Sequence, residues 1–221
     1  MRVRASFPLQ SPRRGAAWRA ALSLPARRLL PAALVALAAG ACGSGPAPTT
    51  YDLSAPRAGA RFGGAVSGQI VVSEPTAIQT LEAERIIAKD AAGAVSFLGG
   101  AQWADRLPRL VQARLIQTFE NSSRIRAVSR PGDGISADYQ LNTELRAFQI
   151  TSASKEALVE VSAKVVNAKT GRIAGARVVT ARVPVATIDA QNAAQGLDKA
   201  LSSVLVQIVR WMGAAASAGQ A

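Results

Sequence analysis

The second half of the chain alternates apolar and polar residues with the period of two that a half-buried β-strand requires. The pattern runs through Tyr139–Ala147, through Val159–Val165 and again through Arg172–Val183. The last two stretches are joined by Asn167–Gly171, whose composition is typical of a turn. Each strand therefore has one apolar and one polar face, which predicts an antiparallel sheet with one side buried.

Two other stretches place apolar residues three and four positions apart, the spacing of an amphipathic helix. The first helix is predicted from about Gln102 to Glu120 and the second from about Ala190 to Met212. The apolar face of the first comprises Trp103, Leu107, Leu110, Val111, Leu115 and Phe119. The apolar face of the second comprises Ala194, Leu197, Leu201, Val204, Leu205 and Ile208.

Shorter apolar runs complete the sheet. They predict strands at Gln69–Ser73, Glu84–Lys89, Val95–Leu98 and Arg126–Ser129, with a hairpin turn at Asp90–Gly93. Together the elements predict a single α+β domain, a mostly antiparallel or mixed β-sheet with two amphipathic helices packed on one face. We expect the domain to cover residues 65–213 and a disordered tail to cover residues 214–221.

The N-terminal segment has the order of an export signal: basic residues, the apolar run Leu29–Ala39, then small residues and the single cysteine, Cys42. The run is too short to span a bilayer as a stable helix. It resembles a bacterial lipobox, with Ala39 where Leu is usual. We therefore expect residues 1–41 to be removed by cleavage between Ala41 and Cys42, and Cys42 to be lipidated. The alternative is an ordinary secretory signal with an incidental or buried cysteine.

Residues 42–64 are rich in Gly, Pro, Ser, Ala and Thr and are expected to form a flexible tether. Tyr51–Leu53 interrupts this composition as a candidate strand that docks on the domain. Several acyl chains on Cys42 would make a firm membrane anchor. The next residue is Gly43, and under the sorting rule of enteric bacteria a residue other than Asp favours the outer membrane.

Composition removes several classes of function. The chain has no His and one Cys, which excludes an internal disulfide, His-based metal sites and Ser-His-Asp or Cys-His catalysis. Seven of the 26 Lys and Arg residues precede Cys42, and none of the 14 acidic residues does. The formal charge of +12 for the whole chain therefore falls to about +5 for the part from Cys42 onward. The remaining basic residues are scattered, which argues against a nucleic-acid partner. We expect no catalytic residue, no metal and no cofactor.

Two features that could carry chemistry have simpler explanations. Gly99–Gly100 precedes the first predicted helix and could offer backbone amides to an anion, but a loop that closes onto a helix explains it better. Glu82 and Glu84 lie in or beside a strand, and Asp105 lies near a helix start, where the helix dipole alone explains it. An acid–base enzyme is therefore not the expected function.

Three motifs give the chain a resemblance to a known family. They are WADRLP at Trp103–Pro108, ERI at Glu84–Ile86 before the hairpin, and YDL at Tyr51–Leu53 after the lipobox. On these motifs the chain resembles the ABC-type transport auxiliary lipoprotein family from about Tyr51 to Met212. The family motif rests on Trp103, Ala104 and Leu107, for which we expect a structural role. The chain departs from the family in having Thr76–Ile78 where relatives often have a Pro-rich aromatic segment.

The resemblance implies a non-catalytic lipoprotein of the outer membrane that faces the periplasm. Its partners would be an MCE-domain (mammalian cell entry) periplasmic protein, which forms a conduit for phospholipids or related apolar compounds, and the ABC permease and ATPase of the same system. The lipoprotein is expected to dock the end of that conduit. The alternatives are a lipid-binding chaperone and an envelope-assembly lipoprotein without a transport role.

The resemblance also implies a ring or other homo-oligomer. Phe148, Ile150 and Trp211 are expected to be exposed apolar residues that could make such contacts. The predicted core is rich in Ala and Val, which suggests close packing and argues against a cavity wide enough for an acyl chain.

Overall fold

A computed structural model of the whole chain describes residues 47–57, 66–122 and 125–218. The expected signal at 1–41, its cleavage site at Ala41 and the expected lipidation site Cys42 lie outside the described residues, as do residues 58–65. In chain order the elements are β1 (Thr49–Tyr51), β2 (Val66–Val72), β3 (Thr76–Ala77), the 3-10 helix η2 (Gln79–Leu81), β4 (Arg85–Lys89), β5 (Val95–Trp103), α2 (Leu107–Asn121), β6 (Ile125–Ser129), β7 (Tyr139–Thr151), β8 (Glu156–Asn167), β9 (Ile173–Pro184) and α3 (Ala190–Ala218).

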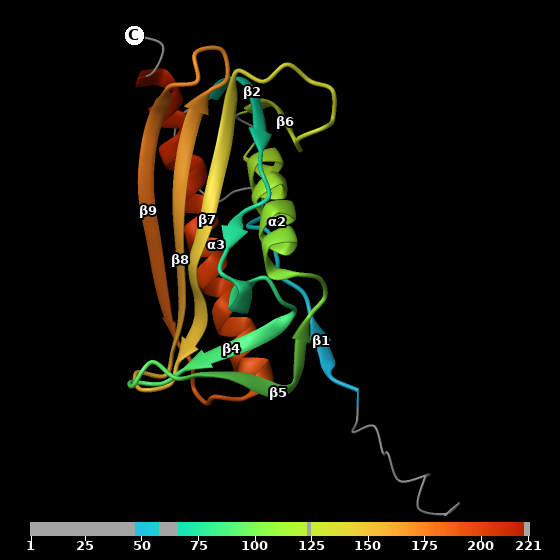
Figure 1. Cartoon of the computed structure of the whole chain (residues 1–221), viewed down its shortest axis with the longest axis vertical. Helices are drawn as coiled ribbons and strands as arrows, with labels where there is room; N and C mark the ends of the chain where they lie inside the picture. The colour runs from blue at the N-terminus through green and yellow to red at the C-terminus, as the bar shows by residue number, and fades with distance from the viewer. Residues whose placement is uncertain (1–46, 58–65, 123–124, 219–221) are drawn as a thin grey trace, which may run out of the picture. The chain divides into compact units, whose positions relative to one another are not determined.

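Strand β7 is the centre of the nine-stranded mixed sheet formed by the described residues (Figure 1). One edge of β7 pairs with β8 in antiparallel register along its whole length, from Tyr139 opposite Asn167 to Thr151 opposite Glu156. Strand β8 pairs in the same way with β9. The other edge of β7 is shared by β2, β3 and β4, which run parallel to it and follow one another along it. Beyond these lie β6, next to β2, and β5 with β1, next to β4.

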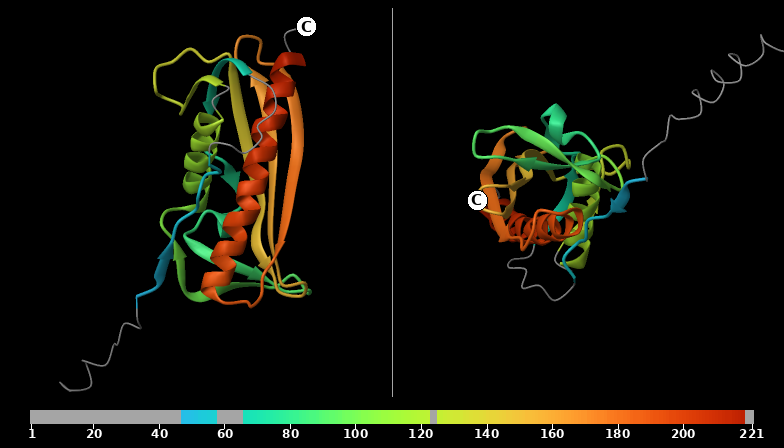
Figure 2. Two further views of the ribbon diagram at one scale, coloured as in Figure 1. Left: turned by 180° about the vertical axis from the view of Figure 1, so that it is seen from behind. Right: turned by 90° about the horizontal axis from the view of Figure 1, so that it is seen from below.

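The two helices lie on the same side of the sheet, and the sheet curls around α3 (Figure 2). The predicted apolar face of α3 is buried, with Leu197, Leu201 and Leu205 fully inaccessible. These side chains belong to one core together with the inward residues of β8, among them Val161 and Ala163. The prediction of a single α+β domain with two helices on one face of a mixed sheet is confirmed.

The alternation in β7 changes phase in the middle of the strand, and this corrects one prediction. The ladder to β8 shifts register between Leu145 and Ala147, which is the signature of a β-bulge. Because one extra residue moves every later side chain to the opposite face, the inward positions switch from odd to even numbers. Phe148 and Ile150 are therefore buried at 1% and 0% exposure, and the expectation that they are exposed is wrong. Trp211 is half-buried against the core.

Helix α2 begins at Leu107, five residues later than the apolar spacing predicted. The cause is Pro108 in its first turn. A helix that began at Gln102 would require the amide of Pro108 to donate a hydrogen bond to the carbonyl of Ala104, and proline has no N–H. In the first turn of a helix the same residue is well tolerated.

Strand β5 and helix α3 are both longer than predicted. Strand β5 continues from Val95 to Trp103 instead of ending at Leu98. Gly99–Gly100 therefore lies within a strand, and the anion-binding alternative loses the helix N-terminus on which it depended. At the other end of the chain, α3 continues to Ala218 and enters the expected tail at 214–221.

The segment 47–57 is docked on the domain by backbone pairing. Strand β1 runs parallel to the end of β5, with Thr49 opposite Ala101 and Tyr51 opposite Trp103. The candidate strand at Tyr51–Leu53 is thus present in part. Within the expected tether of residues 42–64, this portion is held by the sheet.

Side chains that follow β1 attach the same segment to both helices. Leu53 is buried in the core. Asp52 accepts a hydrogen bond from Arg114 of α2 at 2.5 Å in an ion pair. Ser54 donates its N–H and its hydroxyl to the carboxylate of Asp198 in α3, at 2.6 and 2.7 Å. The chain is therefore fixed to the sheet and to both helices before residue 58.

Helix α3 begins with a side-chain cap. The carboxylate of Asp189 accepts the backbone N–H of Asn192 at 2.9 Å and the hydroxyl of Thr187. The backbone bond from Asn192 is the largest cause that lowers the pKa of Asp189 from 3.8 to about 2. A lowered pKa means that the folded state favours the carboxylate, so the stabilisation is complete above pH 3.8 and is lost as the pH falls through about 2.

This cap makes a pH-dependent prediction. The variant Asp189→Asn keeps an acceptor suited to capping but cannot titrate. We expect its melting temperature to be lower than that of the wild type at neutral pH, and the two values to converge between pH 3.8 and about 2. Circular-dichroism melting curves at a series of pH values measure the difference. A difference that stays constant throughout this range would show that the cap is not ionised as described.

Candidate functional site

The motif Trp103-Ala104-x-x-Leu107 forms the corner at which β5 turns into α2. Its three backbone N–H groups donate to three different carbonyls: Trp103 to Glu84 at 2.6 Å, Ala104 to Tyr51 at 2.8 Å, and Leu107 to Ala83 at 3.3 Å. The corner therefore joins the docked N-terminal segment to the turn that precedes β4. The local sequence explains this geometry, because Pro108 holds the helix start at Leu107.

The two large side chains of the same corner are buried. Trp103 is 1% exposed and contacts Phe148 of β7 edge-on, with 5.8 Å between the ring centroids and 83° between the planes. This arrangement is one that aromatic pairs prefer. Leu107 is also 1% exposed. Trp103 and Leu107 are thus placed to hold the fold together and are inaccessible to a partner or substrate, whereas Ala104 is exposed and contributes through its backbone N–H.

A second feature lies where β2 leaves β7. Their ladder ends with the N–H of Ser73 bonded to the carbonyl of Leu141 at 3.0 Å, and pairing resumes at Thr76 opposite Glu144. Pro75 lies in the interruption, where the chain forms no ladder. On the opposite edge of β2, past its last pair with β6 at Val71, the buried amide of Gln112 in α2 donates to the carbonyl of Val72 at 2.9 Å.

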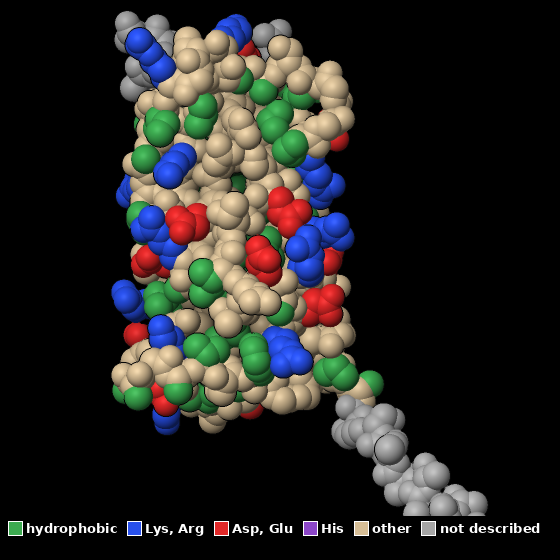
Figure 3. All heavy atoms as spheres, viewed as in Figure 1, with side chains coloured by type: hydrophobic (Ala, Val, Ile, Leu, Met, Phe, Trp, Pro, Cys, Tyr) green, Lys and Arg blue, Asp and Glu red, His purple; other side chains and the backbone are tan. Residues whose placement is uncertain are grey.

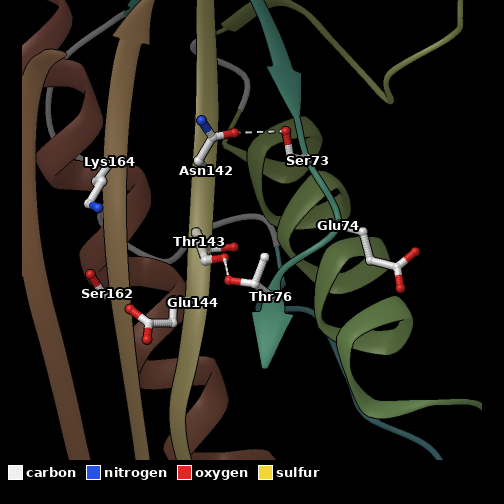
Figure 4. Close-up of a pocket in the computed structure, with 8 residues that line it drawn as sticks. All are labelled: Ser73, Glu74, Thr76, Asn142, Thr143, Glu144, Ser162 and Lys164. Carbon is white, nitrogen blue, oxygen red and sulfur yellow. Dashed lines mark hydrogen bonds between the residues drawn. The ribbon is translucent and has the colours of Figure 1, made fainter. Parts of the chain in front are cut away.

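On the outer face of the sheet the same interruption leaves a polar depression of about 190 Å³ (Figure 4). Its lining comprises Ser73, Glu74, Thr76, Asn142, Thr143, Glu144, Ser162 and Lys164. The hydroxyl of Ser73 donates to Asn142 at 2.8 Å and accepts from Gln140 at 3.0 Å. A larger hollow of about 570 Å³ shares Glu74 and is lined also by Arg109, Gln112, Arg130 and Pro131.

These hollows suit polar contacts better than catalysis or an acyl chain. Glu74 pairs with Arg106 at 3.0 Å and Glu144 with Arg146 at 3.3 Å, so both carboxylates already have a cation beside them. Across the described ranges, no group of three or more His, Cys, Asp or Glu residues could hold a metal ion. The lowered pKa of Asp189 is explained by its cap and marks no acid–base site.

A third feature is an exposed apolar run at the end of the molecule formed by β4 and β5. Val95 and Phe97 are 46% and 44% exposed, and the guanidinium of Arg85 lies over the Phe97 ring at 4.7 Å from its centroid. The sequence predicted a hairpin strand here, but the alternation does not show which of its faces is left uncovered. None of the described helices is long and apolar enough to span a bilayer.

Comparison with known proteins assigns the chain to a family. The model of the ABC-type transport auxiliary lipoprotein component family matches residues 51–209, most of the chain. The chain belongs to this family. Its members are transport auxiliary lipoproteins, which are membrane-anchored, and the family is not one of enzymes. The resemblance inferred from the Trp103 and Tyr51 motifs is confirmed.

Two solved structures share the fold. Protein XCC0632 from Xanthomonas campestris is 26% identical, with a TM-score of 0.71, and the match covers 76% of this chain and 97% of that one. A second solved protein, described as uncharacterized, has a TM-score of 0.59 at 12% identity, with coverage of 76% and 99%, and supports the fold alone.

Sequence comparison gives one further relative. The uncharacterized protein bll6063 of Bradyrhizobium diazoefficiens is 32% identical over 166 residues, which are 73% of this chain and 44% of that protein. The chain therefore spans less than half of the length of this curated relative.

The buried corner predicts a large stability effect. We expect Trp103→Ala to lower the free energy of unfolding by about 3–5 kcal/mol, because it removes the ring contact with Phe148 and leaves a cavity. Trp103→Phe should lose less, since an aromatic ring remains. Phe97→Ala, at a half-exposed site on the same strand, is the matched control and should change little. Urea unfolding of the three variants measures the effect, and equal losses at positions 103 and 97 would contradict it.

Proposed function

We propose that the chain is the lipid-anchored, outer-membrane adaptor of an MCE-type ABC transport system, and that it docks the end of the periplasmic lipid conduit. The observation that carries the proposal is the family match over residues 51–209. A lipobox-like segment that ends at Cys42 lies a short distance before the matched residues. In this proposal the signal is cleaved after Ala41 and Cys42 becomes the acylated N-terminus. Phospholipids or related apolar compounds are the cargo.

Because residues 47–57 are docked on the domain, only a short stretch of chain separates the domain from the proposed lipid anchor at Cys42. Four residues lie between Cys42 and Ala47, the first described residue, so the connection spans five Cα–Cα steps. At no more than about 3.6 Å per residue, the chain can extend at most about 18 Å between them, whatever its conformation. The domain would therefore work close to the membrane that holds its lipid, and the conduit would have to approach that membrane to meet it.

The proposed role is non-catalytic and depends on surfaces. The described hollows are polar and their carboxylates have cationic neighbours. Docking of a partner's polar groups is compatible with such surfaces. The interior is closely packed where β8 meets α3, with Val159 and Leu201 at 0% exposure. This packing favours an adaptor over the alternative of a lipid-binding chaperone, which requires space for an acyl chain.

The anchor makes the first functional prediction. We expect Cys42→Ala to release the processed protein into the soluble periplasm, because the acceptor of the lipid is lost. Ala39→Leu, which restores the usual lipobox residue, is the matched control and should leave the protein membrane-bound. Membrane fractionation with immunoblotting measures both variants. A Cys42→Ala protein that has lost its signal and still sediments with membranes would contradict lipidation at this residue.

The second functional prediction concerns the proposed partner. We expect the membrane-anchored protein, extracted in mild detergent, to co-purify with an MCE-domain protein encoded beside an ABC permease and an ATPase. Persistent failure to recover this partner, with the lipoprotein itself intact, would reject the adaptor role. Gene neighbours without such a system would favour the envelope-assembly alternative.

A further inference from the structure

The β4–β5 end of the domain presents an uncharged, partly apolar edge. The run Val95–Gly100 has the sequence VSFLGG and contains no charged residue. Val95 and Phe97 are 46% and 44% exposed, and a Cβ atom added at Gly99 or Gly100 would meet no heavy atom within 4 Å. In Figure 3, hydrophobic side chains lie among charged ones at this lower end of the molecule.

The edge is open because β5 is paired on one side only along this run. Its partner is β4, with Val95 opposite Lys89 and Phe97 opposite Ile87. On the other side, the described residues provide no pairing strand until Ala101, where β1 begins. Exposed strand edges are usually protected by charged residues, proline or covering elements. An unprotected edge of this kind marks a contact surface.

The direction of β1 indicates what lies against this surface. Because β1 runs parallel to β5, with Thr49 opposite Ala101, its N-terminal end points toward Gly100 and the exposed run. The described chain therefore begins, at Ala47, at the end of β1 that is nearer to Val95–Gly100. Cys42 is five positions earlier, which is at most about 18 Å of extended chain.

We propose that the run Val95–Gly100 rests on the lipid surface that holds the anchor and so orients the domain on the membrane. The inference depends on the proposed lipidation of Cys42. Val95 and Phe97 supply the apolar contact, since aromatic and aliphatic side chains partition into the boundary between headgroups and acyl chains. Arg85, whose guanidinium lies over Phe97, provides a cation at the same place for lipid phosphates.

A fluorescent label at position 95 tests the contact. Acylation consumes the thiol of Cys42, so the variant Val95→Cys offers a single reactive thiol for the dye NBD. The full-length lipidated protein is reconstituted into vesicles of phosphatidylethanolamine and phosphatidylglycerol that contain a nitroxide-labelled lipid. We expect at least twofold stronger quenching than in the control Ile173→Cys. Ile173 is also an exposed apolar strand residue, at 61%, but it lies in β9 at the opposite end of the sheet, opposite Val166 of β8, which in turn pairs with Gln140 near the start of β7.

A second substitution shows whether the apolar contact causes the quenching. Adding Phe97→Asp to Val95→Cys should reduce the quenching to the level of the position 173 control. Equal quenching at positions 95 and 173 overturns the proposal. A label at 95 that is shielded only after an MCE-domain protein is added also overturns it, because the run would then bind protein.

Mass spectrometry of the same samples separates this inference from the function on which it rests. Acylated Cys42 together with an unquenched label at position 95 rejects the membrane contact and leaves the anchored adaptor standing. Absence of acylation at Cys42 rejects the anchor itself. Strong quenching on an acylated chain supports both.

Discussion

The two edges of β7 impose the constraint on which the rest of the structure depends. One edge is satisfied by a single long partner, β8, and the other by three short strands that succeed one another. The chain must leave the ladder between these strands, and each departure leaves backbone groups that need partners. The departure after Val72 leaves the polar depression on the outer face, lined by Ser73, Thr76 and Asn142. At the same point Gln112 bonds the carbonyl of Val72 from the other edge of β2 and fixes α2 against that strand.

Hydrophobic periodicity predicted the large elements well and their irregularities poorly. The alternation in β7 to β9 and the helical spacing of α3 each reflect one buried face, so they are visible in the sequence. The bulge beside Arg146 adds a single residue, and only the register with β8 shows that it moves Phe148 and Ile150 into the core. Pro108 could have indicated the late start of α2. The apolar spacing continues on the N-terminal side of this proline, however, so it predicted a helix that begins too early, at Gln102.

The candidate site was likewise predicted in part, with some features visible in the sequence and others visible only in the tertiary structure. The Trp103 motif identified the family, yet the apolar spacing placed Trp103 on a helix. Trp103 is the last residue of β5, and it lies four positions before Leu107, so it fits the spacing of the buried face of the helix that follows. Gln112 is absent from the apolar face predicted for that helix, and nothing in the local sequence distinguishes a buried hydrogen-bonded amide from a solvated one. The exposure of Val95 and Phe97 depends on which strands leave β5 uncovered, which is a property of the tertiary arrangement.

Strand β1 ties the first described residues of the chain to the strand that carries the exposed run. Three residue pairs alone give a weak strand, so the burial of Leu53 and the bonds of Asp52 and Ser54 to the two helices must hold it. The segment 47–57 is therefore coupled to the sheet and to both helices. Because β1 pairs with the same strand that carries the exposed run, the segment 47–57 and this apolar edge cannot separate without breaking the corner at Trp103. A short linker limits how far a tethered domain can move from a surface, and a contact edge limits how it can rotate. Together they restrict the orientation of the domain more than either does alone.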